Sequence, residues 1–211
     1  MPEITGLKMG KSREKRVNVF LDGAFSFSLL ADVAVKNGLK VGLELSDSEI
    51  DRLQGSDRYQ RCFNAAVRYL GYRPRSESEV RQRLLHHGFD VECTEHTIRS
   101  LKERGLVDDV EFARFWIENR ETFSPRSRRL AGWELRRKGL GNEVIEKAIG
   151  ELDEGDSAYR AAVVKAGRLA APDYATFRRR LGDFLVRRGF GYDVVRETVE
   201  RAWKERGKLP G

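Results

Sequence analysis

The chain has 211 residues, in which 40 Lys and Arg outnumber 33 Asp and Glu to give a formal charge of +7. Charged residues make up 35% and apolar residues 40%, a balance that suits a thin helical array in which each helix keeps a wide solvent-facing side. The sequence contains no run of about 18 apolar residues, which excludes a membrane-spanning helix. The polar stretch Met1 to Arg16 has no apolar secretory core, and two cysteines are too few for a disulfide framework. We therefore expect a cytoplasmic protein with reduced thiols and no membrane contact.

The first regular element is a predicted β-hairpin. The segments 16–21 and 24–29 both alternate apolar and polar residues, and Asp22-Gly23 separates them. Asp-Gly between two alternating runs favours a tight hairpin turn, because both turn residues need positive φ. A lone hairpin is marginal in water, so its apolar side, expected to include Phe25 and Phe27, must pack on the next segments of the chain.

Short helices come after the hairpin. A helix is expected over 31–37, ended by Gly38. Ser46 and Glu49 have the spacing of a capping box, in which each side chain binds a free amide of the first helical turn. From residue 57 onward the pattern is helical.

The most informative feature of the remaining chain is a repeat of about 50 residues. Gly88, Gly139 and Gly189 lie 51 and 50 residues apart. Each follows a helix that ends in basic or histidine residues, which suits the negative helix end, and each supplies the left-handed residue that stops that helix. Apolar residues recur at positions −8, −4, +10 and +13 from these glycines: Val80, Ala131, Leu181; Leu84, Leu135, Leu185; Ile98, Ile149, Val199; Leu101, Leu152, Ala202.

These offsets predict units of helix, helix, turn and helix, about the size of a small DNA-binding module. The expected fold is mainly α, with a short N-terminal β-hairpin and helices followed by three tandem three-helix repeats in an elongated, curved array. The expected boundaries are 1–56 for the N-terminal part and 57–107, 108–155 and 156–211 for the repeats.

Catalytic motifs are missing from the sequence. It contains no Walker-type phosphate loop, no dinucleotide-binding glycine motif after a strand and no nucleophile elbow. Asp108-Asp109 is interpreted as a helix N-cap rather than as an acidic dyad. We therefore expect a protein that is not an enzyme.

A structural metal is the alternative interpretation of one small cluster. His86, His87, Cys93 and His96 lie close in sequence, and Cys93-x-x-His96 has the spacing of a zinc-ligand pair. However, Cys93 falls at the position that valines occupy in the other two repeats, so a small core residue is favoured. No cofactor and no metal are predicted.

Basic residues cluster at equivalent places in the repeats. Arginines seven residues apart share a helix face, as Arg129 and Arg136 do, and Arg180 and Arg187 one repeat later. Such clusters favour a phosphate-tracking or acidic-surface-tracking stripe over a merely solvated face. The predicted stripe contains Arg126, Arg128, Arg129, Arg136, Arg137, Lys138, Arg178, Arg179, Arg180, Arg187 and Arg188, with secondary members Arg73, Arg75, Arg81 and Arg83.

The central block resembles the bacterial RecX family of regulatory proteins. The resemblance runs from about residue 15 to 205 and rests on Ala65-x-Val67-Arg68-Tyr69-Leu70, Arg73-Pro74-Arg75-Ser76-x-x-Glu79, Gly105-Leu106-Val107-Asp108-Asp109-x-x-Phe112-Ala113 and Glu134-Leu135-Arg136-Arg137-Lys138-Gly139-Leu140. Ser124-Pro125 departs from the glycine that this family usually has there. The resemblance implies a non-enzymatic modulator that binds the RecA–DNA filament and opposes RecA recombinase, ATPase and coprotease activities in DNA repair and the SOS response.

The resemblance also implies partners: the RecA filament, and single- and double-stranded DNA bound weakly and in a salt-dependent way. Three unlike units in one chain favour a monomer. A helix-turn-helix transcription regulator, which would bind as a dimer to a preferred site, is the alternative. A plain protein-interaction scaffold, whose binding would not weaken with salt, is a third possibility. Which residues contact RecA is not defined by any motif, so the stripe rests on charge alone.

Overall fold

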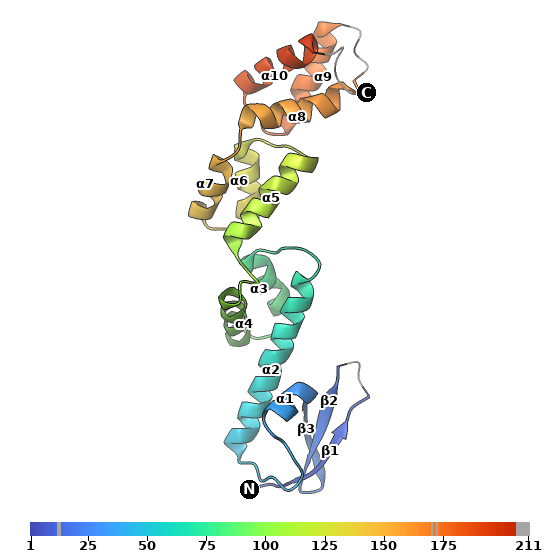
Figure 1. Cartoon of the computed structure of the whole chain (residues 1–211), viewed down its shortest axis with the longest axis vertical. Coiled ribbons are helices and arrows are strands. Elements are labelled where there is room, and N and C mark those ends of the chain that lie inside the picture. The colour runs from blue at the N-terminus through green and yellow to red at the C-terminus, as the bar shows by residue number, and fades with distance from the viewer. Residues whose placement is uncertain (12–13, 170, 172, 206–211) are drawn as a thin grey trace. The chain divides into compact units, whose positions relative to one another are not determined.

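The computed structural model describes residues 1–11, 14–169, 171 and 173–205. They form two compact units: Met1–Arg73 with Val80–Val107, and Pro74–Glu79 with the chain from Asp108 onward. Residues 206–211, the end of the expected third repeat, lie outside the described residues. The elements are β1 Ile4–Met9, β2 Arg16–Leu21, β3 Ala24–Leu30, α1 Ala31–Lys36, α2 Asp47–Leu70, α3 Glu77–His86, α4 Val91–Glu103, α5 Asp109–Phe123, α6 Arg128–Arg137, α7 Asn142–Gly150, α8 Glu154–Ala166, α9 Tyr174–Arg187 and α10 Tyr192–Lys204 (Figure 1).

The predicted hairpin is confirmed as β2 and β3, with Asp22 and Gly23 at φ of 47° and 85°. Strand β1 is an addition that the sequence pattern does not predict; it pairs antiparallel with β2 and makes a three-stranded sheet of order β1-β2-β3. Apolar side chains of the sheet, α1 and α2 form one buried cluster that includes Ile4, Val19 and Leu29. This cluster supplies the packing that a lone hairpin lacks.

One hairpin residue lies on the opposite side from that expected. Phe25 does not share the apolar side with Phe27, because it is 59% exposed whereas Phe27 is 7% exposed. The strand register shifts here, so that Val19 pairs with Phe27 and Phe20 pairs with Phe25. The extra residue of this bulge reverses the alternation, because side chains change sides at every residue. The Phe25 ring instead meets Phe20, edge to face, with the ring centroids 6.0 Å apart.

Helix α2 is the longest element and runs through the expected boundary at residues 56 and 57. Its N-terminus has the predicted capping box, in which Ser46 Oγ accepts from the Glu49 amide and the Glu49 carboxylate accepts from the Ser46 amide. Inside the helix, the buried carboxylate of Asp57 accepts a 2.6 Å hydrogen bond from the Leu30 amide and pairs with Arg16 at 3.2 Å. This carboxylate ties the start of the helical region to the sheet.

The repeat pattern found in the sequence is confirmed by the structure. Gly88, Gly139 and Gly189 have φ of 84°, 82° and 88°, and each ends the second helix of its repeat. The leucines four residues earlier are all at most 1% exposed, and the −8 positions are at most 2% exposed. Repeat one consists of the C-terminal half of α2 with α3 and α4, repeat two of α5 to α7, and repeat three of α8 to α10.

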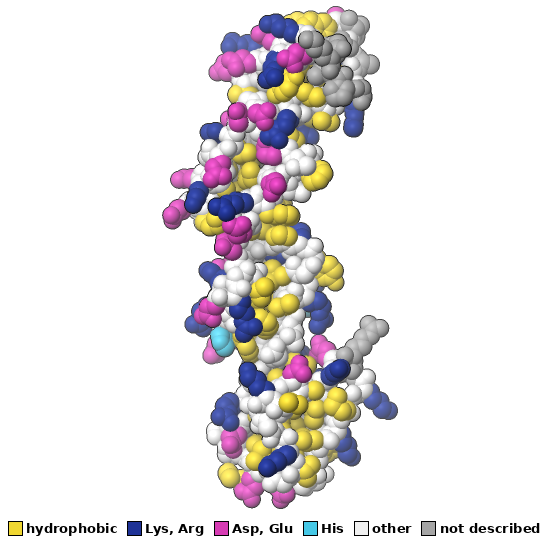
Figure 2. All heavy atoms as spheres, viewed as in Figure 1, with side chains coloured by type: hydrophobic (Ala, Val, Ile, Leu, Met, Phe, Trp, Pro, Cys, Tyr) yellow, Lys and Arg dark blue, Asp and Glu magenta, His cyan; other side chains and the backbone are white. Residues whose placement is uncertain are grey.

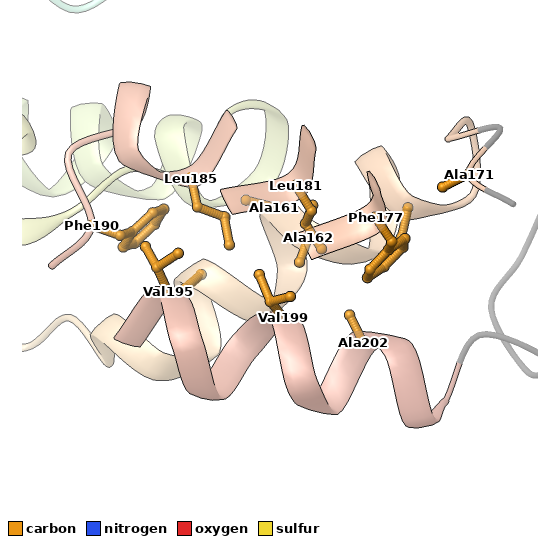
Figure 3. Close-up of a cluster of buried hydrophobic side chains, with 12 residues drawn as sticks. Ala161, Ala162, Ala171, Phe177, Leu181, Leu185, Phe190, Val195, Val199 and Ala202 are labelled. Atoms are coloured by element: carbon orange, nitrogen blue, oxygen red, sulfur yellow. The ribbon is translucent and has the colours of Figure 1, made fainter. Parts of the chain in front are cut away.

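Figure 3 shows the core of repeat three. Leu181 and Leu185 of α9 point toward Val195 and Val199 of α10, and Phe190 closes the end of the cluster next to the turn. Alanines of α8 form the remaining side of this core, so the three helices approach closely. A core of small and medium side chains matches the modest apolar content of the sequence.

Within the second compact unit one contact recurs at a helix N-cap: a serine donates to the carbonyl of the residue before a turn glycine, Ser76 through its hydroxyl and Ser127 through its amide. Ser76 Oγ accepts from the Glu79 amide and donates a 2.6 Å hydrogen bond to the carbonyl of Lys138. Ser127 caps α6, and its amide donates to the carbonyl of Arg188 at 3.1 Å. Both serines are 0% exposed, and each stands twelve residues before the glycine of its own repeat.

The turn glycines fit closely against these caps. A Cβ on Gly139 would lie 2.3 Å from the Cβ of Ser78, and a Cβ on Gly189 would lie 2.5 Å from Ser127 Oγ and 3.1 Å from Leu130 Cβ. A Cβ on Gly88 would meet nothing within 4 Å. Gly139 and Gly189 are therefore needed for a close approach as well as for their positive φ.

The second helix of repeat three differs from those of the first two repeats at its N-terminus. This helix, α9, has 14 residues, whereas α3 and α6 have 10 each. The cap of α9 is Asp173, sixteen residues before Gly189, instead of a serine at twelve. The recurring contact thus has no counterpart at α9 within the described residues.

Candidate interaction faces of repeats two and three

Helix α6 buries one side and exposes a basic, aromatic side. Its N-cap Ser127 starts the helix so that Ala131 and Leu135 point into the core. The opposite side presents what we name the α6 face: Arg129, Trp133, Arg136 and Arg137, all exposed.

Trp133 is the main apolar group of the α6 face. It is 49% exposed, and the guanidinium of Arg137 lies 4.7 Å from its ring centroid. Trp and Arg are among the residues most enriched at the energetic centres of interfaces, and here the two interact as a cation–π pair. Charge spacing alone does not single out Trp133, although its position four residues before Arg137 places it on the same exposed side.

Helix α9 presents a second basic side, which we name the α9 face: Arg178, Arg179 and Val186. All three are exposed, and Val186 is 59% exposed. Arg187 is exposed on the side of the helix that it shares with Arg180. Asp173 caps this helix by accepting from the Thr176 amide, and that hydrogen bond is the main reason that the pKa of Asp173 lies below its usual value. Arg180, also predicted, is exposed on the same helix.

Four members of the predicted stripe make structural contacts instead. Lys138 Nζ lies 2.8 Å from Glu79 Oε1 and 4.9 Å from the Trp116 ring centroid. Arg128 Nε donates to the Leu152 carbonyl at 2.8 Å. The remaining two are Arg126, which pairs with Glu134, and Arg188, which donates to Ser124 Oγ and to the Pro125 carbonyl, both at 2.9 Å.

Glu134 is the charge around which part of this network forms. It is 8% exposed and accepts from Arg120 Nε at 2.7 Å and from Trp116 Nε1 at 3.0 Å, in addition to its pair with Arg126. Burial, and then the charge of Arg126, lower the pKa of Arg188 below its ordinary value. These side chains therefore stabilise repeat two and its contact with repeat three, and they are less available at the surface than the exposed arginines.

The secondary, repeat-one members are also engaged. Arg81 Nε lies 2.6 Å from Glu95, the Arg83 guanidinium is 5.5 Å from the Tyr69 ring centroid, and Arg75 lies 3.9 Å from Glu79. Arg73 is half-buried. The exposed arginines of the predicted stripe thus lie on α6 and on α9. Most of the secondary arginines in repeat one instead contact other side chains of the fold.

Acidic side chains lie on the third helix of each repeat. Exposed examples are Glu143 and Glu146 on α7, and Glu197 and Glu200 on α10. Figure 2 shows Lys and Arg interleaved with Asp and Glu on the visible side of the molecule. Each cluster of exposed basic side chains is therefore confined to one side of one helix, and the net charge of the chain does not show where these clusters lie.

The small candidate sites of the sequence have structural roles. Cys62 and Cys93 are buried in the core of repeat one, and burial followed by the neighbouring Cys62 thiol raises the pKa of Cys93 to about 12. Asp108 caps α5 by accepting from the amides of Val110 and Glu111, at 2.7 and 3.2 Å, which confirms its predicted role. Among the described residues, no three His, Cys, Asp or Glu side chains gather as metal ligands would.

Tandem three-helix repeats with arginines exposed on single helix faces define a class of protein: a tandem helical-repeat protein. None of its described helices combines the length and the apolar character that crossing a membrane requires.

Comparison with known families identifies the particular repeat. Models of the RecX N-terminal domain and of the first, second and third RecX three-helix domains match residues 2–46, 62–105, 108–149 and 153–199. The regulatory protein RecX of Bacillus licheniformis is 31% identical over 204 residues, which cover 95% of this chain and 77% of the relative. That of Clostridium botulinum (strain Alaska E43 / Type E3) is 28% identical over 207 residues, which cover 96% and 97%. The chain belongs to the RecX family of regulatory proteins.

Solved structures agree with this fold. A crystal structure of regulatory protein RecX is 21% identical, covers 95% of this chain and all of the other, and superposes with a TM-score of 0.71. RecX from Lactobacillus salivarius is also 21% identical, covers 69% of this chain and 97% of its own, and has a TM-score of 0.61. At this identity the likeness concerns the fold alone.

Proposed function

We propose that this chain binds the RecA–DNA filament in the cytoplasm, acts there without catalysis, and inhibits the recombinase, ATPase and coprotease activities of RecA in DNA repair and the SOS response. Membership of the RecX family supports the proposal. The observation that carries it in the structure is the α6 face, where three exposed arginines share one helix side with an exposed Trp.

The side-chain chemistry of the faces suits a polyanionic, extended partner. Arg129, Arg136 and Arg137 on α6, and Arg178 and Arg179 on α9, present planar guanidinium groups, which bind phosphates and carboxylates in pairs of hydrogen bonds. Weak, salt-dependent binding of bare single- and double-stranded DNA is expected from the same groups.

The helix-turn-helix alternative is disfavoured by the placement of charge. In that motif the helix after the turn enters the major groove and contacts base edges. Here those helices, α7 and α10, expose Glu143, Glu146, Glu197 and Glu200, which would repel DNA phosphates. The arginines of the α6 and α9 faces lie on the preceding helices, whereas α10 exposes Arg196 and Arg201 beside its glutamates. A selection experiment that yields a preferred DNA site would reverse this conclusion.

The decisive experiment measures RecA ATPase on single-stranded DNA with increasing amounts of the chain. We expect inhibition at near-stoichiometric amounts. The triple variant Arg129→Glu, Arg136→Glu, Arg137→Glu should bind RecA-coated DNA at least ~10-fold more weakly, because reversing interfacial charges removes attraction and adds repulsion. It should keep its melting temperature, since all three side chains are exposed.

The matched control reverses three exposed arginines elsewhere, Arg61→Glu, Arg68→Glu and Arg99→Glu. It changes the net charge equally, so a general charge effect would weaken both triple variants alike. Full inhibition by the α6 variant would contradict the role of this face, and no inhibition by the unaltered chain would contradict the proposed function. Lys138 is left unchanged, because a glutamate there would face Glu79.

A further inference from the structure

A groove of about 510 Å³ lies between α9 and α10 in repeat three. Gly182, Val195 and Val199 form its apolar floor, and Tyr174 and Tyr192 also line it. Tyr192 is 71% exposed. The volume is within the range of about 300–1,000 Å³ that is usual for ligand sites.

Small side chains create this groove. At the equivalent place in repeat two, a Cβ on Gly132 would lie 3.4 Å from Ile149 and 3.5 Å from Ile145. In repeat three the isoleucines are replaced by Val199 and Val195, and a Cβ on Gly182 would meet only Val195, at 3.8 Å. Each valine is one methylene shorter, so space that is filled in repeat two stays open here.

The rim of the groove carries charges of both signs. Arg178 and Arg179 of α9 and Arg196 of α10 line it, together with Asp183 and Glu200. The three arginines are exposed. Residues 156–211 contain thirteen Lys and Arg against seven Asp and Glu, so the surrounding repeat is also positive.

We propose that this groove binds an amphipathic protein segment whose aliphatic side chains enter between α9 and α10 and whose spaced carboxylates meet Arg178, Arg179 and Arg196. The valine floor and the exposed Val186 offer apolar contact area for the aliphatic side chains. This site goes beyond the proposed function, because it lies on α9 and α10 rather than on the α6 face. Its binding of a peptide can be measured in the absence of RecA and DNA.

A nucleic acid strand fits the groove less well. Its phosphates follow one another without gaps, so they would meet Asp183 and Glu200 as well as the arginines. Tyr174 and Tyr192 offer surfaces on which bases can stack, but the valines of the floor offer bases no hydrogen bonds. A peptide can place acidic groups only where an arginine lies opposite them.

The groove length sets the probe. From Tyr174 to Val186, α9 rises about 18 Å, which matches a helix of about 12–14 residues. The probe is a fluorescein-labelled helical peptide of this length, with Leu at i, i+4 and i+7 and Glu beside them. Three control probes are measured beside it. They are the same peptide with Lys in place of Glu, the same peptide with Ala in place of Leu, and an oligothymidylate of similar length.

Binding of these probes to the full chain is followed by fluorescence anisotropy. The Leu/Glu peptide should bind, and both altered peptides should bind at least ~10-fold more weakly. The variants Gly182→Leu, which fills the floor, and Val186→Glu, which adds a like charge, should each weaken binding to the same extent. Val164→Glu is the matched control, because Val164 is 63% exposed in the same repeat but does not line this groove.

The outcomes separate the possibilities. Failure of the Leu/Glu peptide to bind, equal binding by the Lys version, or binding that survives both groove variants would overturn the proposal. Oligothymidylate binding that Val186→Glu and Gly182→Leu abolish, without peptide binding, would assign the groove to nucleic acid instead. Peptide binding by a chain that fails to inhibit RecA would refute the proposed function and leave this site standing.

Discussion

The three turn glycines allow one energetic test of how the repeats stack. Gly88, Gly139 and Gly189 share the left-handed conformation, with φ between 82° and 88°. They differ in their surroundings, because only Gly139 and Gly189 face a cap of the preceding repeat. Replacing each by Ala therefore separates the cost of the backbone conformation from the cost of the lost close approach.

The expected magnitudes depend on these contacts. Gly88→Ala should lower the free energy of unfolding by about 1–2 kcal/mol, the usual cost of a left-handed residue with a Cβ. Gly139→Ala carries the same cost and, in addition, a Cβ 2.3 Å from that of Ser78, which forces the two segments apart. Separation would break the 2.6 Å hydrogen bond from Ser76 to the Lys138 carbonyl, worth about 1 kcal/mol, and would leave buried groups unsatisfied. The total for Gly139→Ala should reach about 3–4 kcal/mol.

Urea unfolding followed by circular dichroism measures these differences. Because the chain can unfold in parts, hydrogen exchange of the amides in α3 and α6 should accompany it, and Gly139→Ala should speed exchange near Ser76. Gly189→Ala should resemble Gly139→Ala. Equal losses for all three variants would show that the close approach contributes nothing and would refute the stacking argument.

Other predictions concern the core, the sheet contact, an N-cap and a thiol. Leu135→Ala should cost about 2–5 kcal/mol in urea unfolding, because this side chain is 0% exposed; an unchanged stability would place it outside the core. Asp57→Ala should lower the free energy of unfolding by about 3 kcal/mol, since it leaves Arg16 without its buried carboxylate; an unchanged free energy would contradict a role for this ion pair. The hydrogen bond from the Thr176 amide lowers the pKa of Asp173, so its contribution is complete above the unfolded value of 3.8 and is lost as pH falls through the folded pKa. Asp173→Asn should therefore flatten the acid side of the melting-temperature profile, and an identical profile would contradict this. Cys93, with its pKa raised to about 12, should react with a disulfide reagent at pH 8 only as the chain unfolds; rapid reaction of the native chain would contradict its burial.

Much of the helical fold could be predicted because its signals are local. The repeat glycines, the −4 leucines and the capping box at Ser46 each depend on a few neighbouring residues. Strand β1 escaped prediction because Gly6 and Lys8 interrupt a weak alternation and its pairing with β2 is non-local. The side reversal at Phe25 depends on a bulge, which single-residue alternation does not reveal.

The candidate faces were predicted less completely, for a different reason. Arginine spacing indicated two helices that carry exposed arginines, but it could not separate exposed arginines from those that bind other parts of the chain. Lys138 and Arg188 each stand directly before a turn glycine. Lys138 pairs with Glu79, and Arg188 donates a hydrogen bond to Ser124. Those partners lie more than fifty residues away in sequence, beyond the reach of a local pattern.

The extra turn and the aspartate cap of α9 distinguish the third repeat from the first two. Ser76 and Ser127 each receive the next unit, whereas Asp173 begins a longer helix on which the same contact is missing among the described residues. A repeat placed after the third would therefore meet an aspartate cap instead of the buried serine that Ser76 and Ser127 supply.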